Sequence, residues 1–358
     1  MCGRQLHLQL KDDGWVAQVG KTDLDNFIQS QQYFALAVVP SSEGLNAASQ
    51  AKDIDRAADS MTGSTGIPVV GTDGMLNSQY TDPWIWPVAA STATSMRIMA
   101  HHAIAAGAHD LAIVYDQNYR FGPEGAGAFV KQAQREGHNV PTACRIALTA
   151  GQQGYGTQAK SFNDNCKSTD FVALLLEPQT AQTWLRESPY LGTRADGTGK
   201  GFGGPQPLFD KQFGDNCGDT CKNMEIWTSM YPPIYPYDQQ AAVRTFKQDL
   251  CAVDNDCNVH SLSAFTEGGY AGMELLVTAL QKTSPYLTRE RLKATLDSLI
   301  LDDGINGVLT FKPGVHYANL TMVAFKDTYS GGSASFQYED GSQQTDPCPS
   351  CQDPALNQ

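Results

Sequence analysis

The sequence predicts an α/β protein built around a parallel, doubly wound sheet. Its main evidence is a repeated order: an apolar run, a loop of small polar residues and a helix-forming segment follow one another three times before Gly122. Parallel strands need such crossover helices, and this order is their usual sequence pattern. With 358 residues and 41% hydrophobic content, the chain is long enough for two lobes with a core each.

The first elements are expected within the first 50 residues. The alternation of apolar and polar residues from Leu6 to Leu10 predicts a strand with one buried face. Residues 21–31 are expected to form a helix and residues 34–39 a buried strand. The loop 40–44 then opens a second helix.

The next segment, 67–87, contains a strand and an extended passage. The apolar run 67–70 predicts a buried strand that ends in the polar loop 71–74. Ligands of open α/β sheets bind at the carboxyl ends of such strands. Residues 83–87 contain two prolines, which lack the amide donor of a helix interior, so an extended connector is expected there.

A helix, a strand and a second helix should follow. Ser91 or Thr92 can cap a helix that Gly107 ends. Residues 111–115 predict a strand followed by the polar turn 116–122, and Pro123 starts the helix that runs to Glu136. His101 and His102 are interpreted as ordinary residues of the first of these helices.

The remaining elements continue the same rhythm. Residues 192–222, rich in Gly, Asp and Cys, are expected to form an irregular surface loop, and residues after Tyr329 a flexible tail. Thr288 should cap a helix. The other expected elements are strands at 171–176, 224–230, 308–311 and 320–325, helices at 180–187, 238–250, 263–283 and 288–299, and an extended passage at 231–237.

Eight of the nine cysteines can be grouped into pairs. Three pairs are local and lie among loop-forming residues, and a fourth pair is more widely spaced, which leaves Cys2 without a partner. Halves of a zinc site are the alternative, but no paired histidines complete a tetrahedral set, so disulfides are favoured. Disulfides indicate an oxidising compartment. The pairs are Cys217–Cys221, Cys251–Cys257, Cys348–Cys351 and Cys144–Cys166.

Charge and motifs exclude several classes of function. The net charge of -13 and the lack of clustered Lys and Arg argue against a nucleic-acid partner. No apolar run is long enough to cross a bilayer. We find no nucleophile elbow, phosphate-binding loop or zinc-peptidase motif, so neither an enzyme nor a resident cofactor or metal is expected.

An ordered series of short motifs resembles a known family. The series comprises Cys2-Gly-Arg with Lys11-Asp-Asp, Pro40-Ser-Ser, Gly66-Ile-Pro-Val-Val, Tyr115-Asp with Phe121-Gly, and the Tyr270 helix that ends in Leu275-Leu-Val-Thr-Ala-Leu280. Their order, from Cys2 to about Lys326, is similar to that of the type I periplasmic solute-binding proteins of ABC transporters. Within this family, the leucine/isoleucine/valine-binding branch is the one it resembles.

The resemblance implies two Rossmann-like lobes with parallel sheets, joined by three crossing strands and closing on a ligand held between them. The crossings would lie at 83–89, near Val259 and near Leu320. The implied bounds are 1–88 with 260–318 for lobe 1, 89–259 with 319–340 for lobe 2, and 341–358 for the flexible tail. The family has a strand and a helix ahead of the Gly-Arg strand, so we expect that the first lobe lacks them and that a signal peptide is absent with them.

The resemblance also implies the residues that hold the ligand. Hydroxyls and backbone amides of lobe 1 would hold its carboxylate, and an aromatic turn and an acidic loop of lobe 2 would close from the other side. Helix capping and turn chemistry are the alternative explanation for the Ser and Thr–Asp positions, and the resemblance favours ligand contact there. Amino-acid binders often hold the ammonium group with an acid that here falls near Asn223 or Glu225. The candidate residues are Ser41, Ser42, Thr72, Asp73, Tyr119, Phe121, Glu177 and Glu267.

The function implied is that of an extracytoplasmic protein that captures a small polar solute, an amino acid or a related compound, for uptake by an ABC transporter. Its partners would be that solute and the permease. A lipid anchor would require a segment that the sequence does not contain. The alternative is a ligand-sensing module of the same fold that signals to a receptor.

Overall fold

The computed structural model describes residues 5–14, 16–40, 42–188 and 201–352. The chain divides into two compact units. Unit 1 comprises Met1–Ser91 and Gly268–Asn319, and unit 2 comprises Thr92–Glu267 and Leu320–Gln358. The chain therefore passes from one unit to the other three times.

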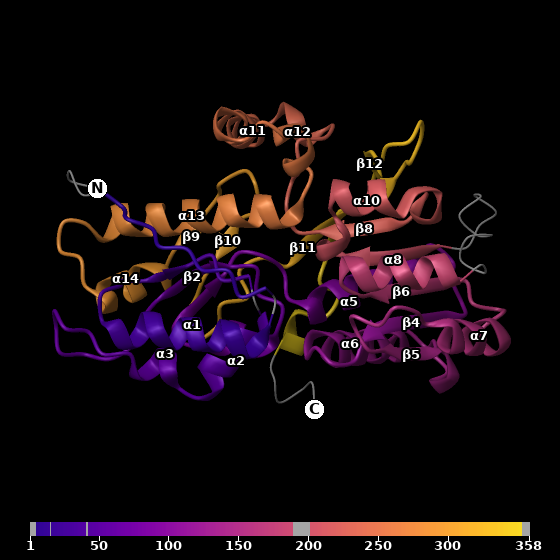
Figure 1. Cartoon of the computed structure of the whole chain (residues 1–358), viewed down its shortest axis with the longest axis horizontal. Coiled ribbons are helices and arrows are strands. Elements are labelled where there is room, and N and C mark those ends of the chain that lie inside the picture. The colour runs from indigo at the N-terminus through magenta and orange to yellow at the C-terminus, as the bar shows by residue number, and fades with distance from the viewer. Residues whose placement is uncertain (1–4, 15, 41, 189–200, 353–358) are drawn as a thin grey trace. The chain divides into compact units, whose positions relative to one another are not determined.

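Unit 1 is built on a parallel sheet with the strand order β1-β2-β3, beside a separate antiparallel pair of β9 and β10 (Figure 1). Helix α13 begins at the end of unit 2 and continues through the first part of unit 1's second segment. The elements are α1 (Ala17–Ser30), β1 (Leu36–Ala37), α2 (Ser42–Gln50), α3 (Asp53–Arg56), β2 (Val69–Thr72), α4 (Asn77–Thr81), β3 (Ile85–Pro87), α13 (Ala264–Thr283), α14 (Arg289–Leu296), β9 (Ile300–Leu301) and β10 (Leu309–Thr310).

The core of unit 1 forms where helices α1, α2 and α3 pack on the parallel sheet. Buried apolar side chains of these helices, such as Leu24 and Leu45, cluster with Val69 of β2 and Ile85 of β3. Helix α13 also approaches β2 very closely. A Cβ atom added to Gly71 would lie 2.2 Å from the Cα of Gly272, so only glycines permit this contact.

One expectation for unit 1 is wrong. The segment from Leu6 to Leu10 forms no strand, and Leu10 is 84% exposed. No described strand pairs with it, and a lone strand leaves its backbone groups unpaired and its apolar face uncovered. Residues 85–87 are extended as expected, and they form β3, which pairs with β2 as an edge strand of the sheet, a position that tolerates Pro87.

Unit 2 contains an eight-stranded sheet within the described residues, with the order β12-β11-β8-β7-β6-β4-β5 and β13 paired to β11. Strands β4 to β8 are parallel, and β11, β12 and β13 join antiparallel. The helices are α5 (Thr92–Ala105), α6 (Phe121–Arg135), α7 (Gly156–Asn165), α8 (Pro178–Glu187), α10 (Lys211–Cys217), α11 (Ala241–Val253) and α12 (Cys257–His260), with the short turns η1 (Thr142–Cys144), η2 (Gln206–Leu208), η3 (Gly218–Cys221), η4 (Tyr237–Gln239) and η5 (Pro349–Gln352). The strands are β4 (Leu111–Asp116), β5 (Arg145–Leu148), β6 (Phe171–Leu175), β7 (Phe202–Pro205), β8 (Glu225–Thr228), β11 (Thr321–Asp327), β12 (Phe336–Tyr338) and β13 (Gln344–Thr345).

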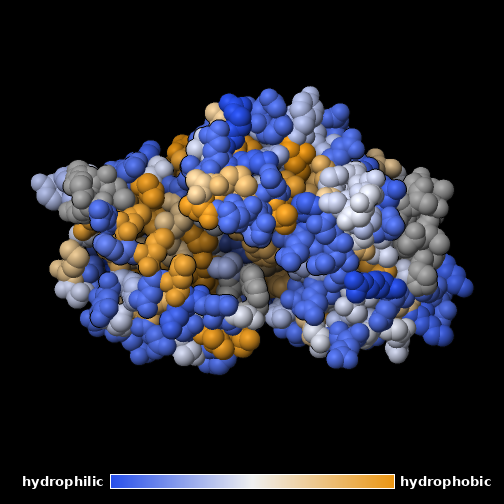
Figure 2. Space-filling view, turned by 45° about the horizontal axis from the view of Figure 1, so that its top comes forward, coloured by the Kyte–Doolittle hydropathy of each residue, from blue (hydrophilic) through white to orange (hydrophobic). Residues whose placement is uncertain are grey.

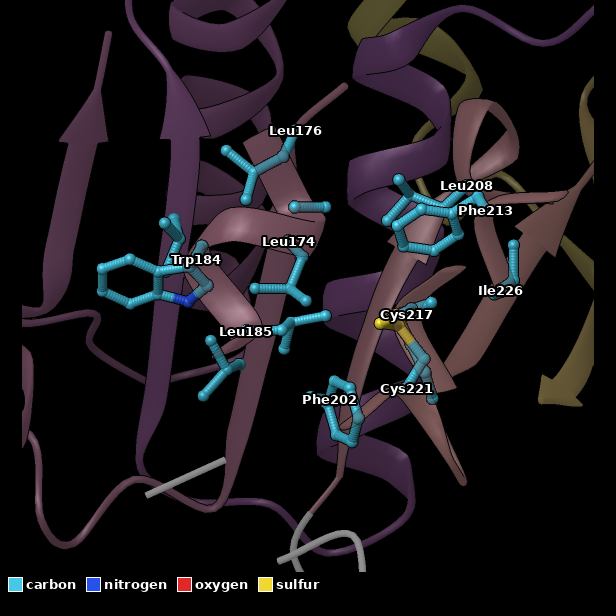
Figure 3. Packing of buried hydrophobic residues seen from close by; sticks show 14 of the residues in the cluster. Leu174, Leu176, Trp184, Leu185, Phe202, Leu208, Phe213, Cys217, Cys221 and Ile226 are labelled. Atoms are coloured by element: carbon cyan, nitrogen blue, oxygen red, sulfur yellow. A yellow bond between two sulfur atoms is a disulfide. The ribbon is translucent and has the colours of Figure 1, made fainter. Parts of the chain in front are cut away.

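Helices cover both faces of this sheet. On one face, Leu174 of β6 and Ile226 of β8 pack with Trp184 of α8 and Phe213 of α10 (Figure 3). On the other face lie α5 and α6, where Gly125 of α6 packs against the side chain of Leu175. Alternate residues of each strand thus serve opposite faces, as expected for a doubly covered parallel sheet.

The prediction of an irregular loop over 192–222 is wrong for its described part, residues 201–222. Here β7 lies between β6 and β8 with all four residues buried. Its sequence, Phe-Gly-Gly-Pro, is typical of a turn. The glycine at 203 is needed because β8 passes close by: a Cβ on Gly203 would lie 2.7 Å from the carbonyl oxygen of Glu225. Strand β5 and helix α7 were not predicted either.

The segment expected to be a flexible tail contains regular elements. β12, β13 and η5 lie after Tyr329, and Asp346 is buried against α5. Pairing of β12 and β13 with β11 supplies the backbone partners that order this segment. Residues 353–358 lie outside the described ranges.

The four predicted disulfides are present: Cys144–Cys166, Cys217–Cys221, Cys251–Cys257 and Cys348–Cys351. The cap of α14 is also confirmed, since the Thr288 hydroxyl accepts from the Arg291 amide at 3.2 Å. Cys2 lies outside the described residues.

Hydrophilic side chains cover most of the surface seen in Figure 2, with hydrophobic side chains in scattered patches. Exposed apolar residues include Leu8, Met61 and Val253. None of the helices in the described ranges combines the length and the apolar composition that crossing a bilayer requires.

Candidate functional site

The carboxyl ends of β1 and β2 gather polar groups in unit 1. The Thr72 hydroxyl donates to the carbonyl of Val39 at 2.6 Å, which ties the loop after β2 to the loop after β1. The side-chain amide of Gln79 makes two hydrogen bonds. Its Nε2 donates to the backbone carbonyl of Ser42 at 3.1 Å, and its Oε1 accepts from the backbone amide of Leu76 at 3.2 Å. Ser42 and Thr72 therefore lie at the same edge of the sheet. Gln79, which holds the start of α2 through Ser42, was not predicted from the sequence.

Two groups at this edge of unit 1 are withdrawn from solvent without a partner among the described residues. They are the hydroxyl of Ser42, the first residue of α2, and one carboxylate oxygen of Asp73. Burial raises the pKa of Asp73 to about 7. Since hydroxyls and the amides at the start of a helix donate to anions, this edge is suited to hold a carboxylate. Ser41 falls outside the described residues.

Unit 2 presents an equivalent edge at the carboxyl ends of β4 and β6. Asp116 ends β4 and is fully buried, and one of its oxygens accepts from the Glu177 amide at 2.9 Å. The Thr180 hydroxyl donates to the Glu177 carboxylate at 3.2 Å. The second oxygen of Asp116 has no hydrogen-bond partner in the part of the chain that the structure describes. Two acids thus meet beside one hydroxyl, an arrangement able to accept hydrogen bonds from a cation or a hydroxyl group.

The aromatic pair predicted after β4 lies close to this edge in sequence and in space. The rings of Tyr119 and Phe121 stack with centroids 5.6 Å apart. In the same turn, Gln117 donates to the Thr149 hydroxyl at 2.9 Å, which links the loops after β4 and β5. The Asn118 side-chain oxygen also accepts from the Ala150 amide at 2.8 Å, so the start of the turn is anchored to the loop after β5.

Two polar residues farther along the sheet were missed. Gln206 follows β7 and Ser229 follows β8, and the Ser229 hydroxyl donates to the Gln206 side-chain oxygen at 3.0 Å. Ser229 could have been found as the polar residue that ends an apolar run. Gln206 gave no such signal because β7 itself was not recognised. Asp116 carries the same signal as Thr72, a polar residue directly after a buried strand.

Glu267 occupies a different setting from the other candidates. It lies in the first turn of α13, fully buried, and neither of its carboxylate oxygens has a partner among the described residues. Burial raises its pKa well above the ordinary value. Burial thus favours the protonated form of this carboxyl over the carboxylate, and a protonated carboxyl can donate as well as accept a hydrogen bond.

The acid expected near Asn223 or Glu225 for an ammonium group is not part of this edge. Glu225 is the first residue of β8, whereas Asp116 and Glu177 follow the ends of β4 and β6. Because these strands are parallel, Glu225 lies at the opposite edge of the sheet.

The buried carboxyl of Asp116 predicts a pH dependence of unit 2. Burial, followed by the charge of Glu177, raises its pKa from 3.8 to about 7. A raised pKa means that the folded state binds the proton more tightly, so this stabilisation is complete below about pH 4 and is lost as the pH rises through about 7. With Asp116→Asn, the melting temperature measured by circular dichroism should fall less between about pH 4 and pH 7 than it does in the wild type. Asp164→Asn, at an exposed site, is the control that should keep the wild-type slope.

A family model described as periplasmic binding protein matches residues 1–328 of the chain. Solved structures match along most of its length. A leucine-binding protein, LivK, from Thermotoga maritima has a TM-score of 0.76 and 14% identity over 94% of this chain and 87% of that one. No curated protein sequence matches significantly.

Two further structures extend the comparison. A solute-binding protein of an ABC transporter from Rhodopseudomonas palustris BisB5, in complex with 3,4-dihydroxybenzoic acid, has a TM-score of 0.76 and 16% identity over 96% of this chain and 88% of that one. A possible leucine/isoleucine/valine-binding protein from Rhodopirellula baltica has a TM-score of 0.73 and 15% identity over 92% and 84%. At such identities the structures show the fold alone.

Proposed function

Because the chain belongs to the periplasmic binding protein family, we propose that it captures a small polar solute, an amino acid or a related compound, for uptake by an ABC transporter. The membership confirms the resemblance, the type I α/β fold and the expectation of a solute-binding protein instead of an enzyme. The nature of the solute, the permease partner and the lipid anchor belong to the proposal.

The observation that carries the proposal is the chemistry of the two strand edges, each taken in its own unit. The edge of unit 1 offers donors, the Ser42 hydroxyl and the first amides of α2, which suit a carboxylate. The edge of unit 2 offers acceptors on Asp116 and Glu177, which suit an ammonium or hydroxyl group. The two sets, each taken alone, match the two kinds of group found in a solute with a carboxylate and a donor group.

Two classes of molecule are named with the neighbouring proteins, and both fit this description. One neighbour is a leucine-binding protein and another holds 3,4-dihydroxybenzoic acid. We propose the amino-acid class, because Asp116 and Glu177 form a paired acidic group that an ammonium satisfies better than a phenol. Release to a permease would follow from a shift between open and closed forms, which a ligand produces only through different affinities for the two.

The test is a ligand screen followed by calorimetry. Native mass spectrometry of the purified protein should reveal a retained solute, and thermal shift should favour amino acids over hydroxybenzoates. Ser42→Ala should then weaken the affinity about tenfold or more, since a hydrogen bond to a charged group is lost. Ser298→Ala, an exposed serine at the end of α14, is the matched control. Preference for hydroxybenzoates, or no effect of Ser42→Ala, would contradict the proposed class.

A transport role and a sensing role predict different outcomes with the permease. A transport protein with its solute should stimulate ATP hydrolysis by the reconstituted transporter, whereas a sensory module should bind the solute without doing so. The solute-free protein is the control. The extracytoplasmic location we propose agrees with four disulfides, which persist in oxidising compartments.

A further inference from the structure

A second polar cluster lies at the amino-terminal edge of the sheet of unit 2. His102 comes from the end of α5, Glu225 begins β8, and Glu339 directly follows β12. One ligand atom from each side chain lies within 4.8 Å of the other two. The distance from His102 Nε2 to Glu225 Oε2 is 3.9 Å. The cluster is distinct from Asp116 and Glu177, which lie at the carboxyl ends of the parallel strands.

The cluster opens into a cavity of about 720 Å³. Ala106, Phe171, Gly201 and Asn223 are among its other lining residues. Phe171 begins β6, and Gly201 directly precedes β7, so the cavity follows the starts of successive strands. It has room for an ion together with water molecules.

Hydrogen bonds within the cluster satisfy only part of its carboxylate oxygens. Lys326 donates to Oε1 of Glu339 at 2.8 Å. The Oε2 atoms of Glu225 and Glu339 are both out of contact with solvent, and neither has a hydrogen-bond partner within the described ranges. Unpaired buried carboxylate oxygens are costly. A divalent cation would satisfy both oxygens at once.

We propose that His102, Glu225 and Glu339 bind a divalent transition-metal ion of the Zn²⁺ class, with its remaining position open to the cavity. One imidazole and two carboxylates suit such ions, whereas Mg²⁺ and Ca²⁺ prefer six or more oxygen ligands. The rings of Trp227 and His102 pack in a T-shaped arrangement with centroids 4.8 Å apart, which orients the imidazole. Tetrahedral zinc ligands lie about 3.4 Å from one another, so a shift of roughly 1 Å closes the site.

Lys326 is the competitor of the ion. Its ammonium occupies Glu339 in the absence of metal, and its side chain is 42% exposed, so it can turn toward water when an ion binds. The proposal therefore assigns it an effect opposite to that of the three ligands. Removing the lysine should strengthen metal binding, because the ion no longer displaces a bound cation.

The test is calorimetric titration of the chelator-stripped protein with Zn²⁺. One ion should bind per chain, and His102→Gln and Glu225→Gln should each weaken the affinity about tenfold or more. Lys326→Met should tighten it. His101→Gln is the matched control, since the adjacent imidazole pairs with Glu136 at 2.9 Å outside the cluster, and it should leave the affinity unchanged.

Anomalous diffraction at the zinc edge from wild-type crystals soaked in Zn²⁺ provides a measurement that does not depend on how the variants fold. A peak among the three ligands supports the proposal. A peak at the stacked His109 and His138 rings instead, with binding lost in His138→Gln and kept in His102→Gln, overturns it. The absence of stoichiometric Zn²⁺ binding also overturns it.

Discussion

Replacing Gly272 by alanine should destabilise unit 1 by about 3 kcal/mol or more, because the new methyl group has no space. A Cβ atom at this position of α13 would lie 2.4 Å from the carbonyl oxygen of Gly71 and 2.9 Å from its Cα. Both neighbours are backbone atoms of β2, so no side chain can turn away. Relief requires helix and strand to separate, which would also displace the loop that carries Thr72 and Asp73.

Gly269→Ala in the same helix is the matched control. There the nearest atom to an added Cβ is a Val38 methyl at 3.8 Å, an ordinary contact. Since alanine favours the helix, this variant should gain up to about 1 kcal/mol. Chemical denaturation with circular dichroism measures both variants. Equal stabilities for Gly272→Ala and Gly269→Ala would contradict the close approach of α13 to β2.

The sequence was sufficient for those parts of the fold whose pattern is local. Strands such as β2 and β6 are apolar runs that end in polar residues, so their positions followed from this local signal. The candidates Thr72 and Glu177 at their ends followed from the resemblance. The cap of α14 at Thr288 is likewise a local pattern. Asp116 obeys this rule too, and applying it to every strand would have found it.

The parts that were missed depend on distant partners. Strand β7 is glycine-rich because β8 passes close to it, a reason that no window around Gly203 contains. Leu6 to Leu10 alternates as a strand does, but pairing decides whether a strand forms, and the described chain offers none. The metal cluster joins three elements, and His102 alone has the appearance of an ordinary helix residue.

The ion pair of Arg97 and Asp346 is the contact between distant parts of the sequence that should have the largest effect on the stability of unit 2. The guanidinium Nε donates to one Asp346 oxygen at 2.9 Å, and the Thr94 hydroxyl donates to the other at 3.2 Å. The Cys348 amide also donates to Asp346, at 2.9 Å. Both charged side chains are at least 99% buried. The pair thereby fastens the segment after β12 to helix α5, which explains why residues expected to be flexible are ordered.

Arg97→Met should cost unit 2 about 3–5 kcal/mol, because it leaves the Asp346 carboxylate buried without a counter-charge. Asp346→Leu should cost a similar amount by stranding the guanidinium. Since most of each loss is the penalty of an unpaired charge, the double variant should be more stable than either single one. Denaturant unfolding measures all three, and the exposed pair Lys160–Asp164 supplies the control, whose disruption should change stability little. Additive losses in the double variant would show that Arg97 and Asp346 stabilise unit 2 independently, through packing and through the Thr94 and Cys348 hydrogen bonds, and not as an ion pair.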